Sequence, residues 1–379
     1  MIEAIKTYWA NWYVQDAFVA VLLAGATWLG YHLRTREYWR FAFRQVFQRR
    51  IVTASFVVLC LYSFVAVLDS VGYHPRLRDE QGNVRTNPQT GAALTDERGA
   101  SVLDVILTWA KIRDVDETSY SAPLARAALS LETTVNAAGE TVREPPPLKH
   151  PGRHLLGTDR IGQDVLFLAI KSIRTGMILG LITTLIAVLL AIPFGVVAGY
   201  FGGWVDDVIQ YLYTVLASIP NILLIVAFMV IYGQGIFQLS IVLGIASWTG
   251  LCRVLRGETM KLREIEYVQA AEATGVSRVR IMARHIVPNL MHIVLITAVL
   301  GFSGRVMSET ALTYIGIGVG ASTISWGVMI NDALGELTRD PVVWWKLFAA
   351  FIFMLGLVLP ANLFGDAVRD ALDPRLRTR

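Results

Sequence analysis

The chain has 379 residues, of which 54% are hydrophobic and only 17% are charged, and its mean hydropathy is +0.50. A soluble protein of this length would find so much apolar surface hard to bury, so the composition excludes most soluble classes and predicts a membrane protein. The net charge is +4 and the pI about 9.1. We attribute this basic balance to loops beside the membrane and not to nucleic-acid binding.

Long uncharged runs predict where the chain crosses the bilayer, whose hydrocarbon core of about 30 Å takes about 20 helical residues. Run 175–205 predicts one helix, and run 208–252 predicts two that fold back at Tyr232-Gly233-Gln234-Gly235. Run 310–331 is rich in Gly, Thr and Ser, so we expect a loop there that re-enters the membrane. The uncharged runs are 17–33, 51–68, 175–205, 208–252, 286–304, 310–331 and 347–365. Together they predict about seven transmembrane helices.

The distribution of Lys and Arg orients these helices. Segment 34–50 carries six Arg against one acid, and segment 253–284 has seven Lys/Arg against four Glu, so both are expected in the cytoplasm. Loop 71–155 is nearly balanced, with ten basic and eleven acidic residues, and is expected outside. A retained helix at 14–33 then enters the cytoplasm, and a second at 51–70 leaves it.

The outward segment 71–170 is long enough for a small structured lobe. Val102, Val105, Ile106 and Trp109 suggest a short amphipathic helix, and 131–143 reads as a hairpin. Such a lobe could steady a soluble binding protein over a pore, or serve only as a lid or stabilising clip. The sequence leaves both alternatives open.

The segment Glu266–Pro288 is a charged amphipathic insert between two apolar runs. Tyr267, Ala270, Ala271 and Thr274 form one narrow stripe of mostly small residues, which suits a helix that settles into a partner's groove. Gly275 is placed to end this helix and Ser277 to cap the next one. In the second helix, we expect one face to carry Val279, Met282, Ala283 and Ile286. This pattern predicts a surface on which another protein docks.

This insert resembles the EAA loop of ABC importer permeases. That family's pattern is Glu-Ala-Ala, a Gly four residues after the second Ala and a Pro thirteen after the Gly; here it reads Gln269-Ala270-Ala271, Gly275 and Pro288. Gln269 stands in place of the first acid, which affects one possible salt bridge to the ATPase and leaves the docking in place.

Other stretches resemble the dipeptide/oligopeptide (and nickel) subfamily, C-type subunit. They are Leu156-Gly157-Thr158-Asp159 with Gly162-Gln163-Asp164-Val165, Ser325-Trp326-Gly327 with Asn331-Asp332-Ala333 and Trp344-Trp345, and the stretch from Gly365 to Leu376. The resemblance covers roughly 34–70 and 150–379. Helix 14–33 and most of 71–149 fall outside the usual pattern.

The resemblance implies an all-α polytopic inner-membrane protein with the type I ABC importer fold and six family helices. The residues outside the resemblance predict one extra N-terminal helix and an extracytoplasmic α/β lobe, which gives about seven transmembrane helices in total. It implies an importer permease for di- or oligopeptides that works with a second permease subunit, two ATPase subunits and an extracytoplasmic binding protein. The chain itself would bind no cofactor, since ATP and Mg would sit on the ATPases. The implied docking residues are Glu266, Tyr267, Gln269, Ala270, Ala271, Thr274, Gly275, Arg278 and Pro288.

The domain organisation that we expect follows from these assignments. The parts are an extra helix and basic segment 1–50, a helix 51–70, a lobe 71–170, a permease domain 171–366 containing the coupling loop 253–288, and a tail 367–379.

Few other classes of function fit. The chain has no Gly-Lys dipeptide and therefore no Walker A loop, and it has no H-E-x-x-H or G-x-S-x-G motif, so we do not expect an enzyme. A secondary transporter would need inverted repeats that we do not see. Within the importer class, nickel, glutathione or a peptide antibiotic could replace the peptide.

Arg305 and Glu309 interrupt one apolar helix and share a face. Charges at membrane depth usually face protein or a water-filled path. The pair could therefore line the translocation route, or could be a structural pair that holds the helix against its neighbour.

Overall fold

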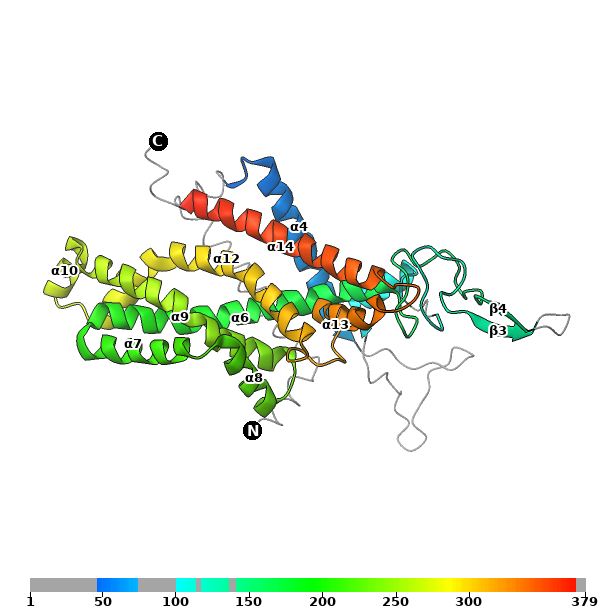
Figure 1. The fold of residues 1–379 in the computed structure, drawn as a ribbon. Coiled ribbons are helices and arrows are strands. Elements are labelled where there is room, and N and C mark those ends of the chain that lie inside the picture. Colours follow the sequence, from blue (N-terminus) through cyan, green and yellow to red (C-terminus); the bar gives the residue numbers. More distant parts are fainter. Residues whose placement is uncertain (1–45, 74–99, 114–116, 136–140, 373–379) are drawn as a thin grey trace, which may run out of the picture. The chain divides into compact units, whose positions relative to one another are not determined.

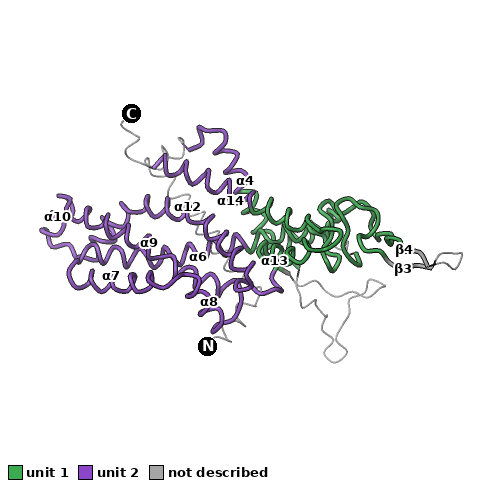
Figure 2. The backbone as a smooth tube through the Cα atoms, in the orientation of Figure 1, with its two compact units in different colours: residues 1–39, 60–175, 324–354 green, residues 40–59, 176–323, 355–379 purple. Residues whose placement is uncertain are grey.

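The computed structural model describes residues 46–73, 100–113, 117–135 and 141–372 (Figure 1). The described chain forms two compact units (Figure 2). Unit 1 contains the described parts of 60–175 and 324–354, and unit 2 those of 40–59, 176–323 and 355–379. The expected helix 14–33, most of segment 34–50 and the end of the tail lie outside the described residues.

Five helices of the described chain are long and apolar enough to cross a membrane. They are α4 (Arg50–Ser70), α6 (Val165–Phe201), α9 (Ile236–Arg263), the continuous helix Arg278–Tyr314 that includes α12 (Val287–Tyr314), and α14 (Trp345–Leu372). A further pair, α7 (Gly203–Ser218) and α8 (Asn221–Tyr232), passes the same test together but bends by 85° at its break. The described residues thus supply five spans, or six if the bent pair is one.

The predicted break of run 208–252 is confirmed, because α8 ends at Tyr232 and α9 begins at Ile236. A second break at Ile219-Pro220 was not predicted. Pro220 has no amide hydrogen to continue the helix, and it disfavours helical backbone at the residue before it. Run 310–331 is confirmed as a poor span: α12 ends at Tyr314, and the chain next becomes helical at α13 (Trp326–Leu337).

The core of unit 2 joins the helices that end near Glu266–Pro288. Residues of α6, α7, α9 and α12 pack in one buried cluster, among them Ala191, Trp248 and Leu290. Small residues of α6 permit this packing, since a Cβ added to Gly199 would lie 2.5 Å from the carbonyl oxygen of Arg256 in α9. Only glycine therefore fits that crossing of two backbones.

Unit 1 contains the short elements of the lobe. The predicted amphipathic helix is α5 (Val102–Trp109), and the predicted hairpin pairs β3 (Glu132–Val135) with β4 (Thr141–Glu144) in antiparallel register. A second small ladder pairs β1 (Gly72–Tyr73) with β2 (Ala100–Ser101). The Ser101 side chain accepts from the Asp104 amide and the Asp104 carboxylate accepts from the Ser101 amide, so a capping box begins α5.

Candidate functional site

The first helix of the predicted docking surface is α10 (Glu266–Ala273). Its end is a Schellman turn: the Gly275 amide donates to the Glu272 carbonyl at 3.0 Å and the Val276 amide to the Ala271 carbonyl at 3.1 Å. Gly275 has φ of +80°, a conformation that L-residues with a side chain rarely adopt. The prediction that Gly275 ends the helix is confirmed.

One residue of α10 is fully enclosed by the rest of unit 2. Val268 is completely buried and belongs to the same cluster as Leu255 of α9, Ile281 and Ile286. Burying a valine side chain stabilises by roughly 1.5–3 kcal/mol. The predicted docking helix is therefore packed directly against the residues that hold the spans together.

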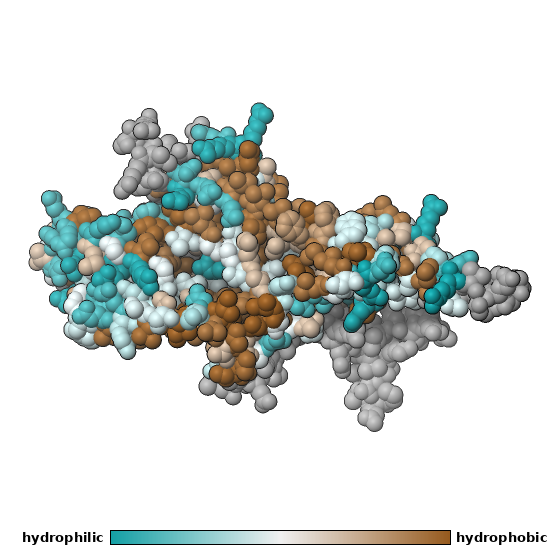
Figure 3. Space-filling view, in the orientation of Figure 1, coloured by the Kyte–Doolittle hydropathy of each residue, from teal (hydrophilic) through white to brown (hydrophobic). Residues whose placement is uncertain are grey.

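The residues of α10 around Val268 are mostly exposed to solvent. Glu266, Tyr267, Gln269, Ala270 and Thr274 are exposed. Ala271 is half-buried and packs against the core cluster, so only part of the predicted stripe faces outward. Figure 3 shows hydrophilic side chains gathered around the α10 end of unit 2.

The second helix differs from the prediction. The chain is α-helical at α11 (Arg278–Ile281) and then forms a π-turn, η1 (Met282–Ile286), before α12. The wider turn shifts the register, so Met282 and Ile286 are buried while Val279 and Ala283 are exposed. The predicted shared face is therefore wrong. Ser277 occupies the N-cap position as predicted, but its side chain makes no capping hydrogen bond.

Pro288 lies directly after the π-turn, as the second residue of α12. Its missing amide hydrogen falls where the α-helical hydrogen-bond ladder is already altered, which lowers the cost of a proline inside this long helix.

Polar contacts also fix the predicted docking surface. Arg278 lies 3.8 Å from the Glu272 carboxylate across the turn, and its guanidinium stacks 5.8 Å from the Phe201 ring of α6. Asn289 of α12 donates to the Tyr267 hydroxyl at 3.0 Å. Gln269 donates to the Glu264 backbone carbonyl at 3.3 Å. These contacts tie both ends of α10 to its surroundings.

Sequence reasoning missed a second brace in unit 2. Arg256 of α9 donates through Nε and Nη2 to the two oxygens of Asp206 in α7, in a bidentate pair. The sequence carried a signal for this ion pair, because Asp206 and Asp207 are the acids that separate the uncharged runs 175–205 and 208–252.

In the lobe, the stretch Leu156–Val165 folds as a closed turn that begins α6. Gly157 has φ of +71°, and an added Cβ would lie 2.5 Å from the Ser121 carbonyl oxygen. Asp159 accepts the amides of Ile161 and Gln163, and Asp164 accepts that of Leu166 at 2.8 Å. The family signature thus corresponds to a rigid entry into α6.

His154 lies two residues before this turn and is almost fully buried. Its Nδ1 lies 3.0 Å from Asp164 and its Nε2 lies 3.4 Å from Glu117. The hydrogen bond with Asp164, followed by the charges of both acids, raises the pKa of His154 despite its burial. Burial alone would raise the pKa of Glu117, but the Lys149 and His150 amides outweigh it, and the net pKa is lowered.

Lys346, at the start of α14, is the buried cation of a second cluster. It lies 2.9 Å from Asp332, 3.6 Å from Glu336 and 3.8 Å from Asp159. Burial raises the pKa of both Asp159 and Glu336, and the ammonium offsets this only in part. Sequence reasoning missed this cluster, because folding brings Asp159 to residues that lie more than 170 positions further along the chain.

Arg305 and Glu309 do not form the pair that their spacing allows. Glu309 is completely buried and accepts hydrogen bonds from the hydroxyls of Thr310 and Thr313, at 3.1 and 3.0 Å. In the described part of the chain, Nε and Nη1 of Arg305 are buried without a hydrogen-bond partner. The Arg305 guanidinium folds back over Gly301. Because glycine has no side chain, Gly301 leaves room for the guanidinium.

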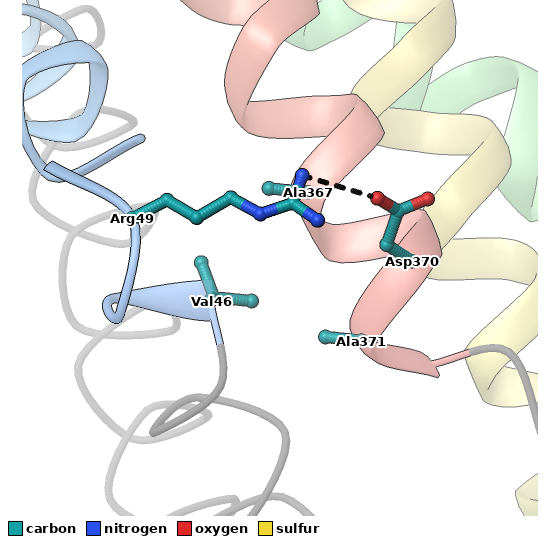
Figure 4. Close-up of a pocket in the computed structure, with 5 residues that line it drawn as sticks. All are labelled: Val46, Arg49, Ala367, Asp370 and Ala371. Atoms are coloured by element: carbon teal, nitrogen blue, oxygen red, sulfur yellow. Dashed lines mark ion pairs between the residues drawn. The ribbon is translucent and has the colours of Figure 1, made fainter. Parts of the chain in front are cut away.

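A small pocket lies where the chain before α4 meets the end of α14 (Figure 4). Its volume is about 30 Å³, room for roughly one water molecule. Arg49 points across it to Asp370, with 3.5 Å between their charged atoms. Both side chains are more than half exposed, so this ion pair stabilises little.

Comparison with known proteins identifies the class. The family model "Binding-protein-dependent transport system inner membrane component" matches residues 191–378. The oligopeptide transport system permease protein OppC of Bacillus subtilis is 33% identical over 61% of this chain and 74% of its own length. OppC of Mycobacterium tuberculosis is 37% identical over 61% of this chain and 79% of its own length. The dipeptide permease DppC of B. subtilis is 33% identical over 59% and 69%.

Among solved structures, the inward-facing MetNI methionine ABC transporter is similar with a TM-score of 0.43 and 16% identity, over 54% of this chain and 96% of that one.

The chain is thus a component of a membrane transport system. It belongs to the binding-protein-dependent transport system inner membrane components, the permease family that its sequence motifs predict, and it is a multi-pass inner-membrane protein.

Proposed function

We propose that this chain is the C-type permease subunit of an ATP-driven importer and forms half of a transmembrane pathway for di- or oligopeptides. An extracytoplasmic binding protein delivers the peptide, a homologous second permease completes the pathway, and two ATPase subunits supply the free energy. The relatives described above are named as oligopeptide and dipeptide permeases, which supports the substrate class. The chain itself binds no ATP or Mg.

The burial of Val268 carries the mechanical part of this proposal. A helix that is exposed on its outer sides and packed on the span core through the buried Val268 and the half-buried Ala271 can act as a rigid lever. When two ATPases close on ATP, they move α10, and the helix bundle alternates between outward and inward openings. The docking residues are those predicted: Glu266, Tyr267, Gln269, Ala270, Ala271, Thr274, Gly275, Arg278 and Pro288.

The proposed pathway includes Arg305 and Glu309. An intramembrane guanidinium with two unpaired nitrogens in the described chain retains hydrogen-bonding capacity that the carboxylate of a passing peptide can use. Glu309, held by two threonine hydroxyls, keeps a fixed position in the same helix.

The test is uptake by cells that lack this chain, complemented with the full-length protein. Radiolabelled di- and oligopeptides are supplied, and nickel, glutathione and a peptide antibiotic are added as competitors. We expect uptake that requires ATP and is competed by peptides. Competition by only one of the other three would move the substrate to that compound, and uptake that persists without ATP would favour a secondary transporter.

A further inference from the structure

The lobe helix α5 is fastened to the ends of two spans by a buried polar cluster. Lys171 of α6 lies 2.6 Å from Asp69, the residue before last of α4, and 3.0 Å from Asp104 of α5. The hydroxyl of Ser101, which caps α5, donates to Asp69 at 2.7 Å. Asp69 and Ser101 are almost fully buried, so this cluster fixes the position of α5.

These anchors stand where the apolar parts of the spans end. Asp69 directly follows the uncharged run 51–68 of α4, and Lys171 shortly precedes the uncharged run 175–205 of α6. Charged side chains avoid the hydrocarbon core and mark its boundary. The α6 helix is 37 residues long, about 55 Å, so it extends well beyond a core of about 30 Å. The cluster therefore holds α5 at the expected boundary of the membrane.

The outward side of α5 is apolar. Leu103 and Leu107 are buried beneath the helix, while Val105, Ile106 and Trp109 face outward with 48%, 44% and 86% of their surface exposed. These three residues are spaced so that they share one face of the helix. An apolar face with a protruding Trp is typical of helices that lie in the interfacial layer of a bilayer.

The neighbouring helix α4 also exposes apolar side chains. In α4, Leu61 and Phe64 are 58% and 60% exposed, as expected for side chains that contact acyl chains. Val71, just after α4, is exposed as well, and its carbonyl accepts the amide of Val102 at the start of α5. The exposed Lys111, just beyond α5, suits contact with anionic head groups.

We infer that α5 is an interfacial helix whose Val105–Ile106–Trp109 face lies in the head-group layer of the membrane, with phospholipid as its partner. It steadies the lobe against the bilayer at the point where α4 and α6 leave the core. The inference rests on the membrane placement of these two spans and not on what the importer carries.

The test places a polarity-sensitive NBD fluorophore on α5 of the full-length chain. Cys60→Ala removes the exposed native thiol, and Cys252 is buried. Trp109→Cys and, as a second site, Ile106→Cys are labelled in nanodiscs of phosphatidylethanolamine and phosphatidylglycerol. The control is Leu131→Cys, an exposed apolar position beside β3, whose hairpin lies at the end of unit 1 opposite α13 (Figure 1).

We expect blue-shifted emission at 109 and 106, quenched more by lipids brominated near the head group than by lipids brominated near the chain end. The probe at 131 should remain solvent-like and unquenched. Emission at 109 and 106 that matches the control would overturn the inference. So would probes that become shielded only when the soluble binding protein is added, since α5 would then face a protein.

Discussion

The amide of Val276 donates a hydrogen bond of 3.1 Å to the carbonyl of Ala271, and this bond closes the turn between α10 and α11. Both side chains pack against the buried cluster that includes Val268. The turn and the span core are thus one packed structure, and the angle at which α10 presents its surface depends on this bond. Substitutions in the turn should therefore change coupling without removing the protein from the membrane.

Gly275→Val tests the turn. No atom lies within 4 Å of an added Cβ, so the cost comes from the backbone, which is left-handed at φ of +80°. A side chain in that conformation costs at least about 1–2 kcal/mol. We expect ATP hydrolysis to be uncoupled from uptake in proteoliposomes while the chain stays in the membrane. Gly257→Ala, at an open helical glycine of α9, is the control and should be neutral. Unchanged uptake by Gly275→Val would contradict the assignment.

Ala270→Glu tests the docking face itself. Ala270 is exposed and lies about 200° around the helix from the buried Val268, so the substitution leaves the chain's own core intact. An unpaired charge in a docked interface costs several kcal/mol, which lowers affinity by roughly 100-fold or more. We expect the ATPase subunits to be lost on purification, and Ala270→Ser to retain them. Ala271→Glu is a poorer probe, because Ala271 packs inward. ATPases that remain bound to Ala270→Glu would show that the face is misassigned.

Arg305→Gln tests the pathway. If the guanidinium binds a peptide carboxylate, losing a charge-assisted hydrogen bond should reduce peptide uptake roughly tenfold or more. Arg305→Lys should restore part of it. The ATPases should still co-purify, because Arg305 lies about 40 Å along the continuous helix Arg278–Tyr314 from the end that adjoins α10. Met307→Leu, at an exposed position of the same helix, serves as the control. Full uptake by Arg305→Gln would make this arginine structural.

His154 predicts a pH dependence of lobe stability. Since its folded pKa is raised above the ordinary value of about 6.5, its contribution is fully present below about pH 6.5 and is lost as pH rises through the folded pKa. We expect protease resistance of the 117–164 segment to fall over that range in the intact chain. His154→Gln should abolish the step. A step of equal size in the variant would assign it to another group.

Lys346→Met should destabilise the lobe strongly. It leaves Asp159 and Glu336 buried without their cation, at a cost of about 3–5 kcal/mol. Because burial already raises the pKa of both acids, acidification should protonate them and recover much of the loss. Thermal unfolding of the solubilised chain measures this, with the exposed Lys149→Met as control. A loss that does not depend on pH would argue against the electrostatic account.

The part of the fold that follows local patterns could be predicted from the sequence. Uncharged runs located α4, α6 and α14, because a span needs about 20 consecutive apolar residues. Gly275 located the end of α10, because left-handed backbone favours glycine. The π-turn at Met282–Ile286 was not predicted, because the predicted face of this segment was read with the regular α-helical period of about 3.6 residues. The bend at Pro220 was not predicted, because it lies within the uncharged run 208–252, where no polar loop marks a break.

The roles of single side chains were harder to predict. Val268 is the one aliphatic residue of α10 larger than alanine, but the stripe read from Tyr267, Ala270 and Ala271 did not include it. The Lys346 cluster depends on residues brought together by folding. Spacing suggested that Arg305 and Glu309 could pair, but the nearer hydroxyls of Thr310 and Thr313 hold Glu309 instead.

The most direct test of the central claim is a gentle detergent purification of the tagged full-length chain from its native membrane, with the companions identified by mass. The account predicts a second permease subunit together with ATPase subunits, and loss of the ATPases in the Ala270→Glu variant. A clean monomer or homo-oligomer, with no ATPase bound at any salt concentration, would contradict it.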